Sequence, residues 1–294
     1  MSSSPESSGW IDLHSHTNAS DGTSTPAELI ALAVRSGLSA LAITDHDTFE
    51  GYETALPIAR AAGLDLVRGI ELNSRLFLDG VAHPRFAHIL VYFPLGVPSR
   101  GFESWLDKQR AERRSRNEKL VKALQDRGVE ITLAEAEARG RSLTGRPHFA
   151  RILVEKGYVS NFDEAFRKYL GEDAPSYVER ECDTTEDVIA LVRTGGGIPV
   201  VAHPIRLGLA RAAEPALFGR LKQAGLAGLE VYHSEHSPSL QAHYAELADK
   251  LDLLPTGGSD FHGMVKPDID LGSGRANNIR VPMAFLEGLR RFVQ

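Results

Sequence analysis

Two histidines near the start of the chain have a spacing that suits metal binding. Residues 11–16 read Ile-Asp-Leu-His-Ser-His, with apolar residues on either side of an aspartate, as in a short strand. Side chains two positions apart on a strand point to the same side, so His14 and His16 converge. Two converging imidazoles are typical metal ligands, and Asp21 in the following loop could add a carboxylate oxygen. By itself this pattern also fits a surface loop that happens to contain two histidines.

Further histidines and carboxylates accompany other predicted strands. Residues 38–44, 64–70, 198–202 and 253–259 read as strands that lead directly into such a residue, and strand 88–93 begins with one. Strands that alternate with helices indicate a mostly parallel sheet or barrel, in which chemistry gathers at the carboxyl ends of the strands. The candidate ligands are therefore His14, His16, Asp21, His46, Glu71, His88, His203, Asp260 and His262.

This set contains nitrogen and oxygen donors but no thiolate. Its nine members exceed the four ligands of one zinc site, so we expect two or three divalent ions, with a carboxylate such as Glu71 as a bridge. The donor types suit Mn²⁺, Zn²⁺ or Fe²⁺. Mn²⁺ is the ion that we expect first. Clustered ions of this kind lower the pKa of a bound water and neutralise phosphoryl oxygens. Phosphoester hydrolysis is therefore the leading hypothesis.

Composition narrows the remaining classes of function. The 294 residues carry a formal net charge of −6, which argues against a mainly electrostatic nucleic-acid binder. The single cysteine, Cys182, allows no intrachain disulfide and favours a cytoplasmic protein. Residues 1–9 are rich in serine and are expected to form a disordered tail, not a signal peptide. Neither a membrane span nor an obligate protein partner is expected.

The alternation of strands and helices is interrupted between residues 99 and 177. This stretch predicts helices over 102–126, 133–138, 148–156 and 161–169. We interpret it as a helical subdomain inserted into a barrel formed by residues 10–98 and 178–294. Residues 99–127 carry nine basic and five acidic side chains, which fits either a solvated helix face or a cationic wall that attracts an anionic substrate. In the second case the insertion would cap the substrate.

The motifs together resemble the PHP (polymerase and histidinol phosphatase) family. They occur in order as HSH at 14–16, TDHD at 44–47, GIE at 69–71, HIL at 88–90, AHP at 202–204 and GSDFH at 258–262. The resemblance implies an α/β fold, a distorted seven-stranded (β/α) barrel with three metal ions. By the family pattern, one ion would be held by His14, His16, Glu71 and Asp260, a second by Glu71, His88 and His203, and the third by Asp21, His46 and His262.

One ligand position departs from the family pattern. Asp21 stands where several relatives have histidine, so the third site is expected to bind its ion more weakly or to prefer another metal. Within the family, the chain resembles short phosphoesterases that have a helical insertion after the fourth strand. That resemblance implies removal of the 3′-phosphate from 3′,5′-nucleoside bisphosphates such as pAp, which leaves a 5′-nucleotide. The alternative is a 5′-to-3′ exonuclease that uses the same metal centre on short RNA or DNA oligonucleotides.

Residues outside the metal set are candidates for contacts with the substrate. In the motif GRPHFAR at 145–151, Arg146 could bind a phosphate through two hydrogen bonds, and His148 could donate another. His233 and His236 could contact the second phosphate or protonate the leaving oxygen. Each of these residues has a plain alternative, such as a histidine at a helix start or in a loop with no special role.

Two further classes of function share parts of this pattern. An amidohydrolase-type barrel also begins with an HxH motif, but such sites usually need a lysine on a middle strand, and no lysine ends a predicted strand here. A metal-buffering or regulatory domain would need blocked coordination positions, which no sequence feature indicates. The resemblance implies a small anionic nucleotide, or a short oligonucleotide, as the binding partner, and a base could stack on Phe77, Phe86 or Tyr177.

Overall fold

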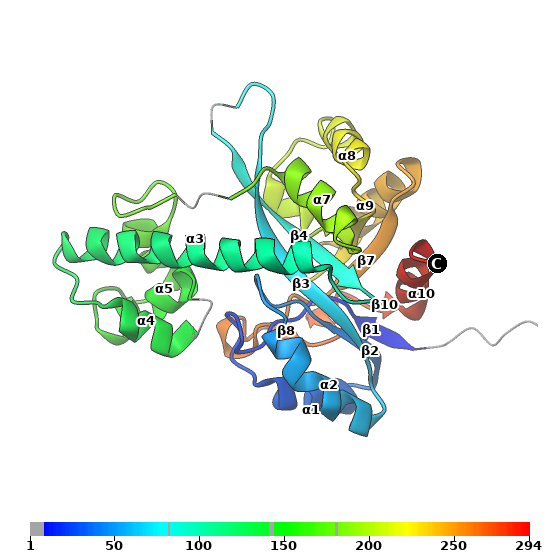
Figure 1. Cartoon of the computed structure of the whole chain (residues 1–294), viewed down its shortest axis with the longest axis horizontal. Helices are drawn as coiled ribbons and strands as arrows, with labels where there is room; N and C mark the ends of the chain where they lie inside the picture. Colours follow the sequence, from blue (N-terminus) through cyan, green and yellow to red (C-terminus); the bar gives the residue numbers. More distant parts are fainter. Residues whose placement is uncertain (1–8, 82, 141–143, 180–181) are drawn as a thin grey trace, which may run out of the picture.

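A strongly curved sheet occupies the middle of the molecule (Figure 1). The computed structural model describes residues 9–81, 83–140, 144–179 and 182–294, so the tail predicted at 1–9 lies outside the described residues apart from Gly9. The strands are arranged in the order β10-β1-β2-β3-β4-β5-β6-β7. Their bounds are Trp10–Asp12 (β1), Leu38–Ile43 (β2), Asp65–Leu76 (β3), Arg85–Phe93 (β4), Ile198–Val201 (β5), Gly228–His233 (β6), Leu254–Gly258 (β7) and Val281–Pro282 (β10).

Most neighbouring strands of this sheet are parallel. β1, β2 and β3 run parallel to one another, and so do β5, β6 and β7, whereas β4 is antiparallel to both of its neighbours. The Leu13 N–H donates to the Gly257 carbonyl at 3.1 Å, which brings the end of β1 beside β7 and nearly closes the sheet. The predicted distorted (β/α) barrel is therefore confirmed, with the short antiparallel strand β10 added beside β1.

Strand β3 is longer than predicted. The strand expected to end at residue 70 continues to Leu76, because it forms an antiparallel hairpin with β4 as far as Leu76 opposite Arg85. The predicted end is wrong because Asn73 is followed by further alternation of buried and half-buried side chains, which is the pattern of a strand with one covered face. Because β4 runs back along β3 in the opposite direction, the first residues of β4 lie beside the last residues of β3. They are therefore at the same edge of the barrel as Glu71.

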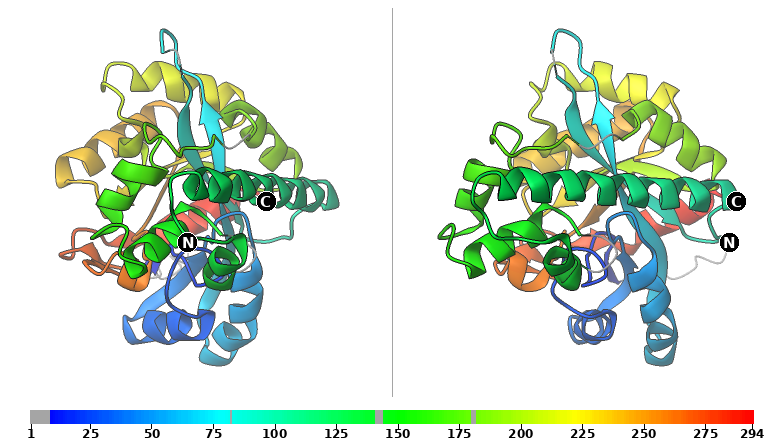
Figure 2. Two further views of the ribbon diagram at one scale, coloured as in Figure 1. Left: turned by 90° about the vertical axis from the view of Figure 1, so that its left-hand side faces the viewer. Right: turned by 60° about the vertical axis from the view of Figure 1, so that its left-hand side comes forward.

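Helices cover the outside of the barrel (Figure 2). Side chains of β4 alternate: Leu90 and Tyr92 pack with residues of β1 and β5, whereas Ile89 and Val91 pack against α7 and α8. α1 begins at a capping box in which the Thr25 and Glu28 side chains each accept the other's backbone N–H. The covering helices are α1 (Pro26–Arg35), α2 (Glu50–Ala62), α7 (Thr185–Thr194), α8 (Glu214–Gln223), α9 (Pro238–Lys250) and α10 (Met283–Phe292).

Shorter elements complete the connections at the edge of the barrel. Two short 3₁₀ helices follow β5 and β7, and a small hairpin lies before β10. They are η3 (Pro204–Leu207), η4 (Gly263–Val265), β8 (Ile269–Asp270) and β9 (Gly274–Arg275). η3 and η4 therefore begin directly after strand-end residues of the predicted metal set.

A second group of helices lies between β4 and α7 in the sequence and beside the barrel in space (Figures 1 and 2). The long helix α3 belongs to both parts, because Phe102 and Leu106 at its start pack in the barrel core, whereas Leu120 and Leu124 pack with the other helices of this group. The last predicted helix of the group is divided into an α-helical and a π-helical turn. The elements are α3 (Arg100–Gln125), α4 (Leu133–Gly140), α5 (Arg146–Glu155), α6 (Phe162–Ala165) and η2 (Phe166–Leu170).

Candidate metal centre

All nine residues of the predicted metal set lie together at one edge of the barrel. The loops after β1, β2, β5 and β7 carry most of them, while Glu71 and His88 belong to β3 and β4. Carboxyl ends of parallel strands meet at one edge, and antiparallel β4 brings its early residue His88 to that same edge, opposite Asn73. The directions of the strands therefore explain why residues distant in the sequence converge.

Glu71 is at the centre of the cluster and is almost fully buried. Its Oε1 atom lies 2.8 Å from His88 Nδ1 and 3.0 Å from His203 Nε2. Its Oε2 atom lies 3.1 Å from His16 Nε2 and 3.4 Å from the nearest nitrogens of His14 and His46. Burial alone would raise the pKa of this carboxyl, but the surrounding histidines lower it well below its usual value. The two oxygens face different histidines, which is the arrangement that a bridging carboxylate needs.

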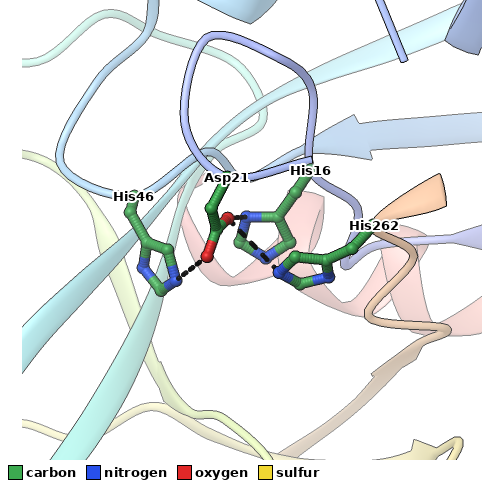
Figure 3. Close-up of side chains that lie close together, drawn as sticks. All are labelled: His16, Asp21, His46 and His262. Atoms are coloured by element: carbon green, nitrogen blue, oxygen red, sulfur yellow. Dashed lines mark ion pairs between the residues drawn. The ribbon is translucent and has the colours of Figure 1, made fainter. Parts of the chain in front are cut away.

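Asp21 gathers a second group of histidines (Figure 3). Its Oδ1 atom lies 3.3 Å from His262 Nε2 and 3.6 Å from His16 Nδ1, and its Oδ2 atom lies 3.7 Å from His46 Nε2. One donor atom from each of these four residues lies within 4.8 Å of the others. Burial lowers the pKa of His46 to about 4, so this imidazole is neutral at pH 7 and has a lone pair available for a cation.

Asp260 connects the histidines to two cationic side chains. Its Oδ1 atom lies 3.5 Å from the Nε2 atoms of both His14 and His16. Its Oδ2 atom accepts hydrogen bonds from Arg206 Nη2 at 2.9 Å and from Lys266 Nζ at 2.6 Å. The backbone of Asp260 has a φ of 56°, in the left-handed region, where a single aspartate is tolerated more readily than most residues. One carboxylate oxygen therefore faces the cluster and the other faces the cations.

The donor atoms fit divalent metal ions. Within the part of the chain that the structure describes, His14 Nε2, His16 Nε2 and His46 Nδ1 are buried and have no hydrogen-bond partner, although carboxylate oxygens face them. Buried polar atoms without partners are costly, and coordination of a shared cation would satisfy all three. Imidazole nitrogens with carboxylate oxygens, and no thiolate, suit Mn²⁺, Zn²⁺ or Fe²⁺.

Sequence reasoning missed Glu230, which holds one of these histidines in place. Glu230 is fully buried in β6. Its Oε1 atom accepts a hydrogen bond from His14 Nδ1 at 2.8 Å, and its Oε2 atom accepts one from the backbone N–H of His203 at 2.5 Å. Such a contact fixes the tautomer and the ring orientation of a ligand histidine. The available signal was a glutamate within the apolar strand 226–232, where a charged residue needs a buried partner.

The four residues predicted to contact the substrate or protonate the leaving oxygen occupy different positions. Arg146 lines the cavity beside the cluster. His148 caps its own helix, since its Nδ1 atom accepts the Gly145 N–H at 3.0 Å. His233 and His236 are fully buried; His233 Nε2 lies 3.4 Å from Asp260 Oδ2, whereas His236 donates from Nδ1 to the Val231 carbonyl at 2.8 Å. Of the four, only Arg146 is among the described residues that line the cavity.

The cavity has a volume of about 260 Å³ and contains both acidic and basic groups. Part of its lining belongs to the cluster, including Glu71 and Asp260. Sequence reasoning found Arg146 and considered the basic stretch that contains Arg113 and Arg116 as a cationic wall, but it missed Arg206 in η3 and Lys266 in the segment after η4. The cationic lining residues are Arg113, Arg116, Arg146, Arg206 and Lys266, and the aromatic ones are Phe86, Phe166 and Tyr177. The cavity is therefore suited to an anion that carries an aromatic group.

Metal binding at this cluster is expected to stabilise the folded chain. At a Mn²⁺ concentration about 100-fold above its Kd, one ion contributes about 2.7 kcal/mol, which for a chain of this length is a rise in Tm of roughly 4 to 5 °C. Differential scanning calorimetry of chelator-treated protein, with and without added Mn²⁺, measures this rise. An excess of EDTA should reverse it, and an unchanged Tm with Mn²⁺, Zn²⁺ and Fe²⁺ alike would contradict metal binding at the cluster.

No helix among the described residues is long and apolar enough to cross a membrane.

The sequence model of the PHP domain matches residues 12–191. A 5′-3′ exoribonuclease of Haemophilus influenzae is 31% identical over 252 residues, which cover 85% of this chain and 89% of that protein. A 3′,5′-nucleoside bisphosphate phosphatase of Chromobacterium violaceum is 31% identical over 264 residues, which cover 89% of this chain and 90% of that protein.

A solved structure shares the fold as well as the sequence. A protein of Bifidobacterium adolescentis that is assigned as a metal-dependent phosphoesterase superposes with a TM-score of 0.80 at 31% identity, over 97% of this chain and 96% of that one. Sequence, fold and the His/Asp/Glu clusters thus agree with the resemblance found from the motifs. The chain belongs to the PHP domain family and is a hydrolase of phosphoesters that depends on divalent metal ions.

Proposed function

We propose that this chain removes the 3′-phosphate from 3′,5′-nucleoside bisphosphates such as pAp and releases a 5′-nucleotide and inorganic phosphate. The observation that supports this most strongly is the divided lining of the cavity. One part is the His/Asp/Glu cluster, and another consists of Arg113, Arg116 and Arg146 from the inserted helices. A substrate with two separate phosphate groups matches both parts, with its ester at the cluster and its other phosphate at the arginines. In this proposal residues 99–177 cap the substrate.

The metal centre in this proposal holds two or three ions, with Mn²⁺ preferred. When bound, they would supply an acidified water and neutralise the oxygens of the phosphoryl group. Glu71 would be shared by two of the ions, because its two oxygens contact separate histidines. The proposed ligand sets are His14, His16, Glu71 and Asp260 for one ion, Glu71, His88 and His203 for a second, and Asp21, His46 and His262 for a third.

Other residues of the chain would act on the phosphate and its leaving group. Arg206 and Lys266 lie against Asp260 and line the cavity, so they would neutralise charge on the phosphate that is removed. The proton for the leaving 3′-oxygen is proposed to come from a water, because His233, like His236, is fully buried and does not line the described cavity. The His233 Nδ1 atom accepts the backbone N–H of Glu235 at 3.1 Å, so in this contact the ring N–H is at Nε2, which faces Asp260 and would orient that carboxylate. The buried contacts of His148 and His236 support no assigned contact with the substrate.

The aromatic part of the lining supports a nucleotide over a simpler bisphosphate. The rings of Phe166 and Tyr177 both lie near Arg146, the residue predicted to bind a phosphate, with ring centroids 5.9 and 5.7 Å from its guanidinium carbon. Phe86 also lines the cavity, so a base could stack at one of these rings. Phe77, the other residue considered for stacking, is 47% exposed and is not part of the lining that the structure describes.

The alternative function is a 5′-to-3′ exonuclease on short oligonucleotides. It is favoured by the Haemophilus influenzae relative, a 5′-3′ exoribonuclease. Both functions would use the same recognition, because each substrate has a 5′-phosphate for the arginines and a phosphorus at the 3′-oxygen for the metal centre. They differ in whether this second phosphate is terminal or carries the rest of a strand.

The products released from a small set of substrates distinguish the two functions. We expect the Mn²⁺-loaded chain to convert pAp to 5′-AMP and phosphate faster than it acts on 3′-AMP, 5′-AMP or histidinol phosphate. Chromatography of the nucleotides and a phosphate assay measure this. Stepwise release of mononucleotides from a 5′-phosphorylated RNA trinucleotide, with pAp inert, would move the assignment to the exonuclease. No turnover of any substrate by metal-loaded protein would contradict both.

A further inference from the structure

The residue after the metal-set histidine His46 has an unusual backbone and a buried charge. Asp47 has a φ of 51°, in the left-handed region, and its side chain is 2% exposed. Its N–H donates to the Glu71 carbonyl at 3.1 Å, and the Glu71 N–H donates to the Asp45 carbonyl at 3.2 Å. The position of His46 therefore depends on how the segment 45–47 is held against β3.

Helix α3 holds this segment from the outside. Arg113 donates to the Asp47 Oδ2 atom from Nη2 at 2.5 Å and from Nε at 3.2 Å. Arg110 Nε donates to the Asp47 backbone carbonyl at 2.9 Å. Both the side chain and the backbone of Asp47 are thus bound by a helix that is part of the insertion, and the Arg113 guanidinium is itself largely buried.

The same part of α3 also holds the segment that carries Arg146. Asn117, one helical turn after Arg113, donates from Nδ2 to the Thr144 carbonyl at 2.7 Å. Arg113 Nη1 lies only 3.3 Å from the point where a Cβ atom on Gly145 would be. Arg113 also lines the cavity. It therefore lies between the loop of His46 and the start of α5.

We infer that Arg113 is a positioning residue that, through Asp47, orients His46 for metal binding and sets its position relative to the phosphate-binding start of α5. This inference rests on the proposed role of His46 as a ligand. Replacement of a residue that holds a ligand histidine in place, without binding the metal itself, typically changes metal affinity by about 10- to 100-fold. Removal of Arg113 should therefore lower the affinity for one ion, the one held by Asp21, His46 and His262. The affinities for the other ions should stay unchanged.

The test is a Mn²⁺ titration of chelator-treated full-length protein by calorimetry, with the bound ions counted by elemental analysis. Arg113→Met is expected to lower the affinity for one Mn²⁺ ion by about 10- to 100-fold. Arg113→Lys should restore part of this affinity, because an ammonium can still contact Asp47. Arg114→Met is the matched control, since Arg114 lies on the same helix, is 58% exposed and pairs with Glu118 and Glu137. It should bind Mn²⁺ as the wild type does.

Methionine at position 113 removes the guanidinium that pairs with the buried Asp47 carboxylate, which threatens folding. The double variant Arg113→Met with Asp47→Asn removes both charges and should show the same selective loss of one ion. Wild-type affinity for every ion in a folded variant would overturn the inference, and so would an equal loss of all ions. If the wild type itself bound no metal, the proposed metal centre would fail instead, so the two failures are distinguishable.

Discussion

Replacement of Glu71 with glutamine is expected to lower kcat for pAp by at least about 10³-fold, which corresponds to about 4 kcal/mol. Glutamine keeps the volume of the side chain but removes the negative charge that faces five histidines. An amide also offers only one oxygen, so it can no longer contact two cations through separate oxygens. Steady-state kinetics with Mn²⁺ at saturation measures the loss, and elemental analysis should show fewer bound ions per chain.

A second buried glutamate provides a matched control for this substitution. Glu214 is 4% exposed and contacts His243 and Tyr244 between α8 and α9, away from the cluster. Glu214→Gln therefore also changes a buried carboxylate that contacts a histidine, yet it should retain the wild-type kcat. If Glu71→Gln kept kcat within about threefold of the wild type and a full complement of ions, Glu71 would not be the bridging ligand.

The metal set could be predicted from the sequence because its residues stand at points that the fold must bring together. A run such as 38–44 is recognisable as a buried strand, and the residue after it has to lie at the edge of the sheet. His88 is the exception, because it is near the start of its strand. It entered the candidate set as the first residue of strand 88–93 and matched the HIL motif, but its place in the cluster follows from the antiparallel direction of β4, which strand periodicity does not reveal.

The residues that were missed depend on long-range packing. Arg206 and Lys266 reach Asp260 from short segments after different strands, and nothing in their local sequence distinguishes them from exposed basic residues. Arg113 is one of several basic residues on α3, and only the arrangement of that helix against the loop of His46 buries it. His148 and His236 show the converse, since their chemistry suits a site while their hydrogen bonds are to nearby backbone.

Replacement of Arg146 with methionine is expected to lower kcat/KM for pAp by roughly 10- to 100-fold, because a hydrogen-bonded charge contributes about 1.5 to 3 kcal/mol. Methionine retains an apolar side chain near Phe166 and Tyr177 but cannot bind a phosphate. The activity on 3′-AMP, which lacks the 5′-phosphate, should change by less than about threefold. Measuring kcat/KM for both substrates therefore separates loss of a phosphate contact from general damage.

Two further variants decide what Arg146 contributes. Arg151→Met, on the same helix but not part of the described cavity lining, should leave both substrates unaffected. Arg146→Lys keeps a charge but loses the planar pair of donors, so its kcat/KM for pAp should lie between those of the wild type and Arg146→Met. Arg146 also donates to the Leu170 carbonyl at 3.3 Å. An equal loss on pAp and 3′-AMP would therefore mean that Arg146 supports the insertion and does not recognise the second phosphate.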